Sequence, residues 1–256
     1  MTGKTIYLHA GMHKTGSTSI QSYLHAHRDI FRARGIYVML NSDIAADPRG
    51  GRVAPANSCG MAHILLRPGL ATPIRVRDQV PEYDDAERRA AIAEIRAFLA
   101  RIATEKVIVS AEAFSFLKTS EERGHLDALA RGHILQPIIF LRERTSWLKS
   151  WERQVAKLLD HATRKDLRND GKIAGYAEHV LDSSPDSPVG RHEDIRNFFG
   201  PDATYLSYEE AMERDGSVIP SFLRAVGLDP ATIPDPAAAE WQNRTFYQQD
   251  DIDNAP

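Results

Sequence analysis

Apolar residues fall along this chain in two alternating patterns. Short continuous apolar runs predict buried strands, and longer segments with apolar residues three or four positions apart predict helices with one apolar face. The predicted strands span 6–8, 36–40, 107–109, 137–141 and 204–207. The predicted helices span 17–32, 61–66, 85–103, 125–132, 143–159, 191–199, 209–214 and 218–226. Strands that alternate with helices predict an α/β fold around a mainly parallel sheet.

Segments rich in proline, glycine and polar residues separate these elements. Residues 41–58 form a predicted loop, and three prolines within 67–84 exclude a long helix there. The residues after 247 are polar, and we expect them to form a frayed tail. The sequence therefore predicts one α/β domain over 1–247 and a C-terminal tail over 248–256.

Composition and charge narrow the class of protein. The chain has 256 residues, 42% of them hydrophobic, which is enough for a sizeable core. Its net charge of −3 argues against a nucleic acid as partner, because non-specific binding to nucleic acid needs a basic surface. Cys59 is the single cysteine, so no disulfide forms within the chain. No apolar run is long enough to span a membrane, and Met1–Lys4 leads directly into the first strand. We therefore expect a soluble, cytoplasmic protein; its oligomeric state stays open.

The first predicted strand ends in a glycine-containing loop with an unusual set of polar residues. Residues 11–18 read Gly-Met-His-Lys-Thr-Gly-Ser-Thr, and a predicted helix begins within them. The N-terminus of a helix carries unpaired backbone N–H groups and a partial positive charge, and it binds anions. Lys14 adds a full positive charge, while Thr15, Ser17 and Thr18 add hydroxyl donors. The stretch therefore predicts a phosphate-binding loop rather than an ordinary helix cap.

The order of residues distinguishes between types of phosphate loop. In nucleoside triphosphatases, the lysine directly follows the second glycine. Here Lys14 precedes Gly16 by two residues, and Ser17 stands where that lysine would be. The stretch His9–Gln21 instead resembles the 5′-phosphosulfate loop of the sulfotransferases that use 3′-phosphoadenosine 5′-phosphosulfate (PAPS), especially the bacterial, carbohydrate-type members. That resemblance implies a three-layer α/β/α fold of the P-loop NTPase-like, sulfotransferase type.

The same resemblance implies how the donor is held. Residues Lys14–Thr18, including Gly16, would bind the 5′-phosphate. Arg142 ends a predicted strand and Ser150 follows eight residues later, an arrangement similar to the family's 3′-phosphate site. The basic Arg-Lys-Gly triplet that closes over the nucleotide in animal cytosolic members is absent, and Arg244 is the candidate substitute. The implied cofactor is PAPS, with adenosine 3′,5′-bisphosphate as its product and no metal.

Two residues are candidates for the base that activates an acceptor. Glu112 follows the strand at 107–109, at the sheet edge where ligands bind in open α/β folds, and heparan-type relatives use a glutamate. His13 adjoins Lys14, and imidazole titrates near neutral pH. His9 is expected to pack or to bond the loop. His63 and Asn57, near a polar loop that leads into a helix, are candidate acceptor-binding residues.

The resemblance makes a sulfotransferase the leading hypothesis, acting on a hydroxyl or amine of a carbohydrate or small metabolite. One alternative is a Mg-ATP-dependent kinase of small molecules or nucleotides with an unusual loop. Another is a non-catalytic nucleotide-binding relative, which the missing basic triplet favours.

Overall fold

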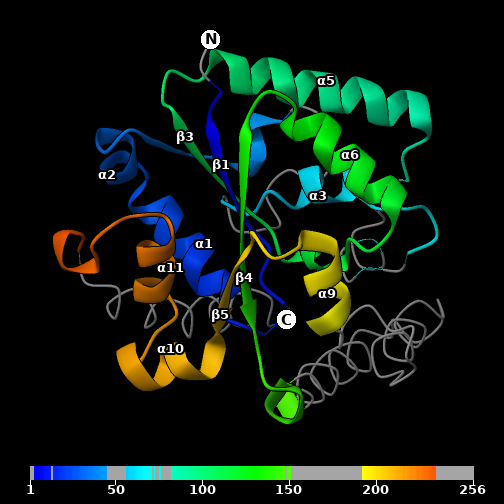
Figure 1. The fold of residues 1–256 in the computed structure, drawn as a ribbon. Helices are drawn as coiled ribbons and strands as arrows, with labels where there is room; N and C mark the ends of the chain where they lie inside the picture. Colours follow the sequence, from blue (N-terminus) through cyan, green and yellow to red (C-terminus); the bar gives the residue numbers. More distant parts are fainter. Residues whose placement is uncertain are drawn as a thin grey trace, which may run out of the picture.

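Five parallel strands form the central sheet of the computed structural model (Figure 1). The structure describes residues 3–12, 14–44, 56–70, 72, 75, 82–147, 149–150 and 192–234. The strands are β1 (Thr5–His9), β2 (Ile36–Val38), β3 (Lys106–Ser110), β4 (Ile134–Leu141) and β5 (Thr204–Ser207). Their order across the sheet is β2-β3-β1-β4-β5, and every pairing is parallel. The predicted α/β fold with a parallel sheet is confirmed.

Helices cover both faces of this sheet. One face carries α1 (Ser17–Ala26), α2 (Arg28–Ala33), α10 (Tyr208–Asp215) and α11 (Ile219–Ala225). The other carries α3 (Cys59–Leu65), α5 (Asp85–Arg101), α6 (Ser120–Ala130) and α9 (His192–Phe199). Short 3₁₀ helices are η1 (Asn41–Asp43), η2 (Glu112–Phe116) and η4 (Pro230–Thr232). The arrangement is the predicted three-layer α/β/α sandwich.

The alternation of side chains along β1 explains the two apolar cores. Ile6 and Leu8 point into the core under α3, α5 and α6, whereas Tyr7 points into the core under α1 and α11. Successive residues of a strand face opposite sides, so a central strand covered on both faces needs apolar residues throughout. Trp147, which follows β4, is 2% exposed and belongs to the first of these cores.

Among the described helices, two differ from the predicted bounds by more than two residues. The single helix expected over 17–32 is broken at His27, whose backbone leaves helical geometry (φ −110°, ψ 15°) while its ring contacts the Tyr23 carbonyl. The break turns α2 toward β2. The helix expected from residue 125 starts at Ser120, because Thr119 and Glu122 form a capping box there.

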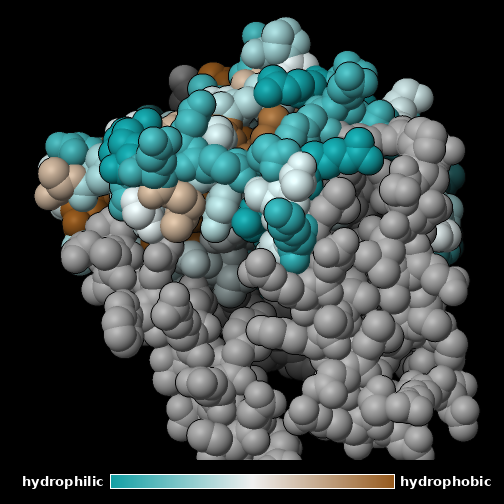
Figure 2. All heavy atoms as spheres, turned by 90° about the horizontal axis from the view of Figure 1, so that it is seen from below, coloured by the Kyte–Doolittle hydropathy of each residue, from teal (hydrophilic) through white to brown (hydrophobic). Residues whose placement is uncertain are grey.

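The topology of the sheet indicates a ligand-binding position at the carboxyl end of β1. The chain leaves β1 toward α1 on one face and leaves β3 toward α6 on the other. In open α/β sheets, a ligand binds outside the carboxyl ends of the strands where such a change of side occurs. β4 points downward in Figure 1, so this edge lies at the bottom of that view. Figure 2 shows the molecule from below, and its coloured residues there are mostly hydrophilic.

Gly16 joins the loop after β1 to α1 and requires glycine for two reasons. Its φ of 81° lies in the left-handed region, where a side chain is strained. A Cβ on Gly16 would also lie 2.7 Å from Cγ2 of Val218, which precedes α11. The start of α1 is therefore packed directly against the C-terminal part of the chain.

Gly16→Ala is expected to lower the free energy of unfolding by about 2–4 kcal/mol, the sum of backbone strain and overpacking. Gly35→Ala is the matched control, because Gly35 has a similar φ of 74° but open space around it. That control is expected to cost about 1–2 kcal/mol. Urea unfolding of both variants measures the difference, and equal losses would contradict the contact with Val218.

Candidate functional site: the loop after β1

The loop between β1 and α1 starts as a continuation of the sheet. The N–H of Ala10 donates to the Ile138 carbonyl over 3.0 Å, and the N–H of Met12 donates to the Phe140 carbonyl over 3.3 Å. The loop then turns through Lys14 (φ 66°) and Gly16 (φ 81°) into α1. Lys14 is the one non-glycine residue with positive φ in the part of the chain that the structure describes. This strained backbone is the type found at ligand sites.

The start of α1 has no side-chain cap. Gly16 occupies the N-cap position and has no side chain to accept from the first N–H groups. Those groups carry the positive end of the helix dipole toward the loop. A helix start of this kind, behind a lysine, provides the backbone donors that an anion needs.

The three loop hydroxyls that the sequence singles out lie in different surroundings. Thr15 is buried, and its Oγ1 donates to the Met12 carbonyl over 2.6 Å, so it holds the loop together. Ser17 is 1% exposed, and its Oγ has no hydrogen-bond partner. Thr18 is exposed on α1. Because an unpaired buried hydroxyl is costly, Ser17 is the hydroxyl most suited to a ligand.

Arg142 connects the loop to the two neighbouring strands. It follows β4, and its Nη1 donates to the carbonyl of Lys14 over 2.6 Å. Its guanidinium lies 4.4 Å from the ring centre of Tyr208, and its Nε is 3.8 Å from Oε1 of Glu209. Arg142 therefore fixes the left-handed backbone at Lys14 from the side of β4 and β5.

Ser150 lies in the helix after β4 and is half-buried. Among the described contacts, Arg142 does not bond to Ser150 but donates to Ser146. The Nε–Oγ distance of that bond is 3.1 Å. Ser146 lies in the first turn of the helix that follows Arg142 and also donates to Glu209 over 2.7 Å. This grouping was missed at the sequence level, since Glu209 comes from a distant strand-helix junction. Its one sequence signal is the i, i+4 spacing of Arg142 and Ser146.

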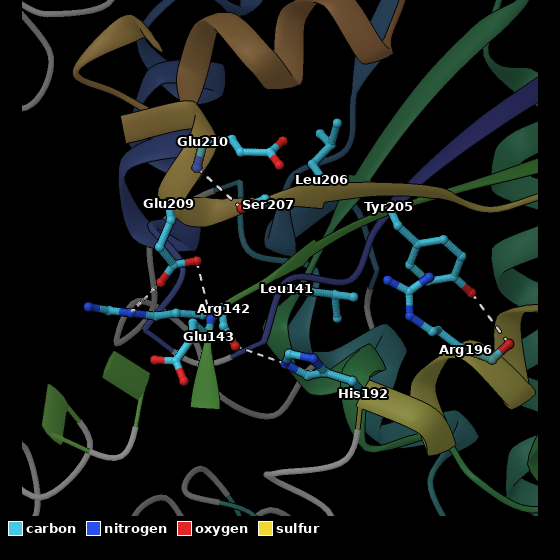
Figure 3. A pocket seen from close by; sticks show the side chains of 10 residues that line it. All are labelled: Leu141, Arg142, Glu143, His192, Arg196, Tyr205, Leu206, Ser207, Glu209 and Glu210. Atoms are coloured by element: carbon cyan, nitrogen blue, oxygen red, sulfur yellow. Dashed lines mark hydrogen bonds and ion pairs between the residues drawn. The ribbon is translucent and has the colours of Figure 1, made fainter. Parts of the chain in front are cut away.

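A pocket of about 380 Å³ opens beside this group, at the carboxyl ends of β4 and β5 (Figure 3). Glu209 points toward Arg142 within it, and the His192 ring contacts the Arg142 carbonyl through Nε2 at 2.8 Å. Glu143 accepts from the N–H groups of Thr145 and Ser146, which lowers the pKa of its carboxyl. The polar residues that line this pocket thus support the backbone around Arg142.

Glu112 lies at the same sheet edge as the loop. It begins η2, directly after β3, and is half-buried. The N–H of the preceding Ala111 donates to the His9 carbonyl over 3.1 Å, which ties the end of β3 to the end of β1. Ser115 closes the turn by donating to the Glu112 carbonyl over 2.7 Å. The shared edge that the sequence predicts for Glu112 and Lys14 is present.

His9 is fully buried at the end of β1. Its Nδ1 contacts Ser110 Oγ at 2.8 Å, and its ring packs edge-on against Phe140 and Phe222. Burial lowers the pKa of the imidazole to about 3, so the ring is neutral at pH 7. His9 packs under the loop, as expected.

The two candidate acceptor-binding residues differ in accessibility. His63 is 1% exposed, and its ring nitrogens contact the Cys59 carbonyl and Thr72 Oγ1, both at 2.7 Å. Both nitrogens are occupied inside the protein, which corrects the expectation of an acceptor-binding histidine. Asn57 is half-buried with an unpartnered Oδ1, and the next residue, Ser58, donates its N–H to the Ser110 carbonyl over 2.7 Å. Asn57 therefore lies near the end of β3.

Some predicted residues lie outside the described part of the chain. These include His13, Arg244, the tail over 248–256, and residues 148 and 151–159 of the helix predicted over 143–159. No described helix is long and apolar enough to cross a membrane. The described residues also hold no cluster of three or more His, Cys, Asp or Glu side chains placed to bind a metal.

Three solved structures with a fold similar to that of this chain are named as sulfotransferases. A sulfotransferase from Alicyclobacillus acidocaldarius matches with 13% identity and a TM-score of 0.46, over 98% of this chain and 93% of that one. The chain is similar to sulfotransferases. The sulfotransferase domain of the Synechococcus PCC 7002 olefin synthase matches with 16% identity and a TM-score of 0.43, over 89% and 74%. The sulfotransferase domain from the curacin biosynthetic pathway matches with 11% identity and a TM-score of 0.42, over 89% and 75%.

No family model matches the sequence, and no curated protein matches it significantly. The three structures are named as sulfotransferases, the class of enzyme whose phosphosulfate loop the stretch His9–Gln21 resembles. At these identities the likeness concerns the fold alone, and the chemistry of the site rests on the residues of this chain.

The burial of His9 predicts a pH-dependent stability. The unfolded chain protonates this imidazole near pH 6.5, whereas the folded chain does so only at about pH 3. The unfolded state therefore binds the proton first, and stability falls as the pH drops below 6.5. We expect a loss of about 2 kcal/mol from His9 between pH 8 and pH 5. Urea unfolding at several pH values measures it. His9→Gln should lack this part of the loss, and an identical pH dependence in that variant would refute it.

Proposed function

We propose that this protein is a sulfotransferase that moves a sulfuryl group from PAPS to a hydroxyl or amine of an acceptor. The observation that carries the proposal is the uncapped start of α1 behind Lys14, with the buried hydroxyl of Ser17 unpartnered beside it. The position of Lys14 two residues before Gly16 supports a phosphosulfate rather than a nucleoside triphosphate.

The residues of the loop fit the 5′-end of such a donor. The first N–H groups of α1 and the Ser17 hydroxyl supply donors without a side-chain cap to compete. Thr15 is used within the loop, so in this proposal it shapes the site while Gly16 allows close approach of the backbone. Thr18, exposed on the first turn of α1, would contact the outer side of the phosphate.

Lys14 would carry the electrostatic part of the reaction. When bound, PAPS supplies the sulfuryl group and a phosphate leaving group. In an in-line transfer, charge develops on oxygens, and a preorganised cation near them lowers the barrier. The strained backbone of Lys14, fixed through its carbonyl by Arg142, preorganises that cation. Lys14 and the N–H groups together neutralise the anion in this proposal, which therefore invokes no metal.

Arg142 would have two roles. Its Nη1 is engaged by the Lys14 carbonyl, while the rest of its planar fork lies at the pocket beside β5. We propose that this fork grips the 3′-phosphate, with Ser150 and Arg244 as further ligands. Glu209 then competes with that phosphate, since it lies 3.8 Å from the same guanidinium.

The acceptor needs a base at the edge shared by β1 and β3. Glu112 is at this edge and half-buried, and His13, next to Lys14, is the rival. A glutamate acts as a base most effectively when its surroundings raise its pKa toward the working pH. Asn57, with an unpartnered Oδ1 near the end of β3, is the proposed contact for the acceptor. A carbohydrate or small metabolite as acceptor follows only from the resemblance of the loop.

Calorimetry with adenosine 3′,5′-bisphosphate and with ATP, each with and without Mg²⁺, tests the donor. We expect the bisphosphate to bind without Mg²⁺ and ATP to bind weakly. ATP binding that requires Mg²⁺, with no binding of the bisphosphate, would favour a kinase. Bisphosphate binding without sulfuryl transfer to any acceptor in a panel of sugars and amines would favour a non-catalytic relative.

Lys14→Ala provides a matched variant for the same assay. This variant is expected to bind the bisphosphate more weakly. Its transfer rate is expected to fall by about 100- to 1,000-fold, the effect of losing one preorganised donor. Lys118→Ala is the control, since Lys118 pairs with Asp194 at 3.5 Å on the other face of the sheet. Equal behaviour of the two variants would remove Lys14 from the mechanism.

Glu112→Gln separates the two candidate bases. The amide keeps the shape of the side chain and removes its basic form, so we expect the rate of transfer to fall by about 100-fold or more with little change in bisphosphate binding. His13→Gln is measured in parallel. A large loss of rate in His13→Gln, with Glu112→Gln unaffected, would assign the base to His13.

A further inference from the structure

A row of buried polar side chains lies beneath the loop and is not used by the reaction proposed above. Gln21 of α1, Ser110 at the end of β3 and His9 at the end of β1 are each no more than 2% exposed. Gln21 Nε2 lies 3.4 Å from Ser110 Oγ, and Ser110 Oγ lies 2.8 Å from His9 Nδ1. Buried polar groups of this kind need a consistent set of donors and acceptors.

The chemistry of these groups fixes the direction of the hydrogen bonds. The amide nitrogen of Gln21 can only donate, so Ser110 Oγ accepts from it. Ser110 Oγ could accept a second bond, but no other acceptor for its own proton lies among its described contacts. That proton is therefore given to His9 Nδ1, because it would otherwise be buried without a partner. A neutral imidazole carries one proton, which must therefore be on Nε2. This row of hydrogen bonds makes His9 Nε2–H a donor at the underside of the loop.

That donor has no partner among the residues that the structure describes. His9 Nε2 and Ser17 Oγ are both buried and unpartnered. The two atoms converge on Gly11, because a Cβ there would lie 2.9 Å from His9 Nε2 and 2.7 Å from Ser17 Oγ. Two buried polar atoms without hydrogen bonds, beneath a loop of the kind that binds anions, indicate that both atoms form hydrogen bonds when an anion is bound.

We propose that His9 is a positioning residue: once an anion is bound, its Nε2–H donates to Ser17 Oγ, so that the proton of Ser17 is left for the anion. In this structure both atoms are still unpartnered. This inference rests on the proposed function for the identity of the anion, an ester phosphate such as the 5′-phosphate of adenosine 3′,5′-bisphosphate. Gly11 is required because any side chain would occupy the space in which these two groups meet.

The fixed direction of the row makes the loop selective for acceptors of hydrogen bonds. An oxygen anion accepts the Ser17 proton, whereas a group that donates would face a donor. A hydrogen-bond donor that is held by buried partners does not need to reorient when the anion binds. Its bond to the anion is therefore stronger than that of a donor that must first be ordered.

The proton on His9 can be observed without any ligand. In protein with ¹⁵N-labelled histidine, long-range ¹H–¹⁵N spectra distinguish a proton on Nε2 from one on Nδ1, and His9→Gln assigns the signal. We expect the Nε2–H form, unchanged between pH 5 and pH 8. In Ser110→Ala, which lacks the group that selects this form, we expect a mixture of the two. An Nδ1–H form in the parent protein would overturn the proposal.

Two substitutions of His9 test its effect on the anion. Glutamine places its amide near the position of Nε2, and asparagine places its amide near that of Nδ1. In calorimetry, we expect His9→Asn to lower the affinity for adenosine 3′,5′-bisphosphate by about 10- to 100-fold, the effect of one hydrogen bond to a charged group. His9→Gln should lose at most a few-fold. His125→Gln, on α6, is the control for replacing a histidine away from the loop.

The outcomes separate this inference from the proposed function. Equal losses in His9→Gln and His9→Asn would show that the ring only packs, which overturns the inference and leaves the sulfotransferase proposal intact. Failure of the parent protein to bind the bisphosphate would refute PAPS as the sulfuryl donor. The spectra of His9 would still test the position of its proton in that case. If both variants unfold, the spectra of the parent protein and of Ser110→Ala decide.

Discussion

The backbone between β1 and α1 passes through two left-handed residues, Lys14 and Gly16, as it turns toward one face of the sheet. Glycine adopts this conformation readily, but a lysine needs support from its surroundings. Arg142 supplies that support with a bond to the Lys14 carbonyl, and Tyr208 and Glu209 in turn hold Arg142. The geometry of this loop therefore depends on Tyr208 and Glu209, which act on it through Arg142.

Much of the fold could be predicted from the sequence because its signals are local. The apolar runs placed all five strands, and the parallel order followed from their alternation with helices. β4 illustrates the error in bounds: it begins at Ile134 rather than Pro137, since the polar Gln136 interrupts the apolar run in the sequence. The break at His27 was missed because the apolar periodicity continues across it. Such a break is set by packing against β2, which a one-dimensional pattern does not contain.

The site could be predicted only in part, for the same reason. The loop was visible because lysine, glycines and hydroxyls are adjacent in the sequence. The partners of Arg142 and the row from Gln21 to His9 come from separate elements, and only the fold brings them together. His63 shows the opposite error: a histidine near a polar loop resembled a ligand, yet its two nitrogens are occupied inside the protein.

The contacts of the loop also bear on how the chain matures during synthesis. Gly16 packs against Val218, His9 packs against Phe222, and Arg142 rests on Tyr208. The first residues of the chain thus obtain their final surroundings from residues about 200 positions later. At translation rates of roughly 5–20 residues per second, the ribosome needs about 10–40 s to add them. The nascent loop lacks these contacts for that interval, so it reaches its final packing only after α10 and α11 have been synthesised.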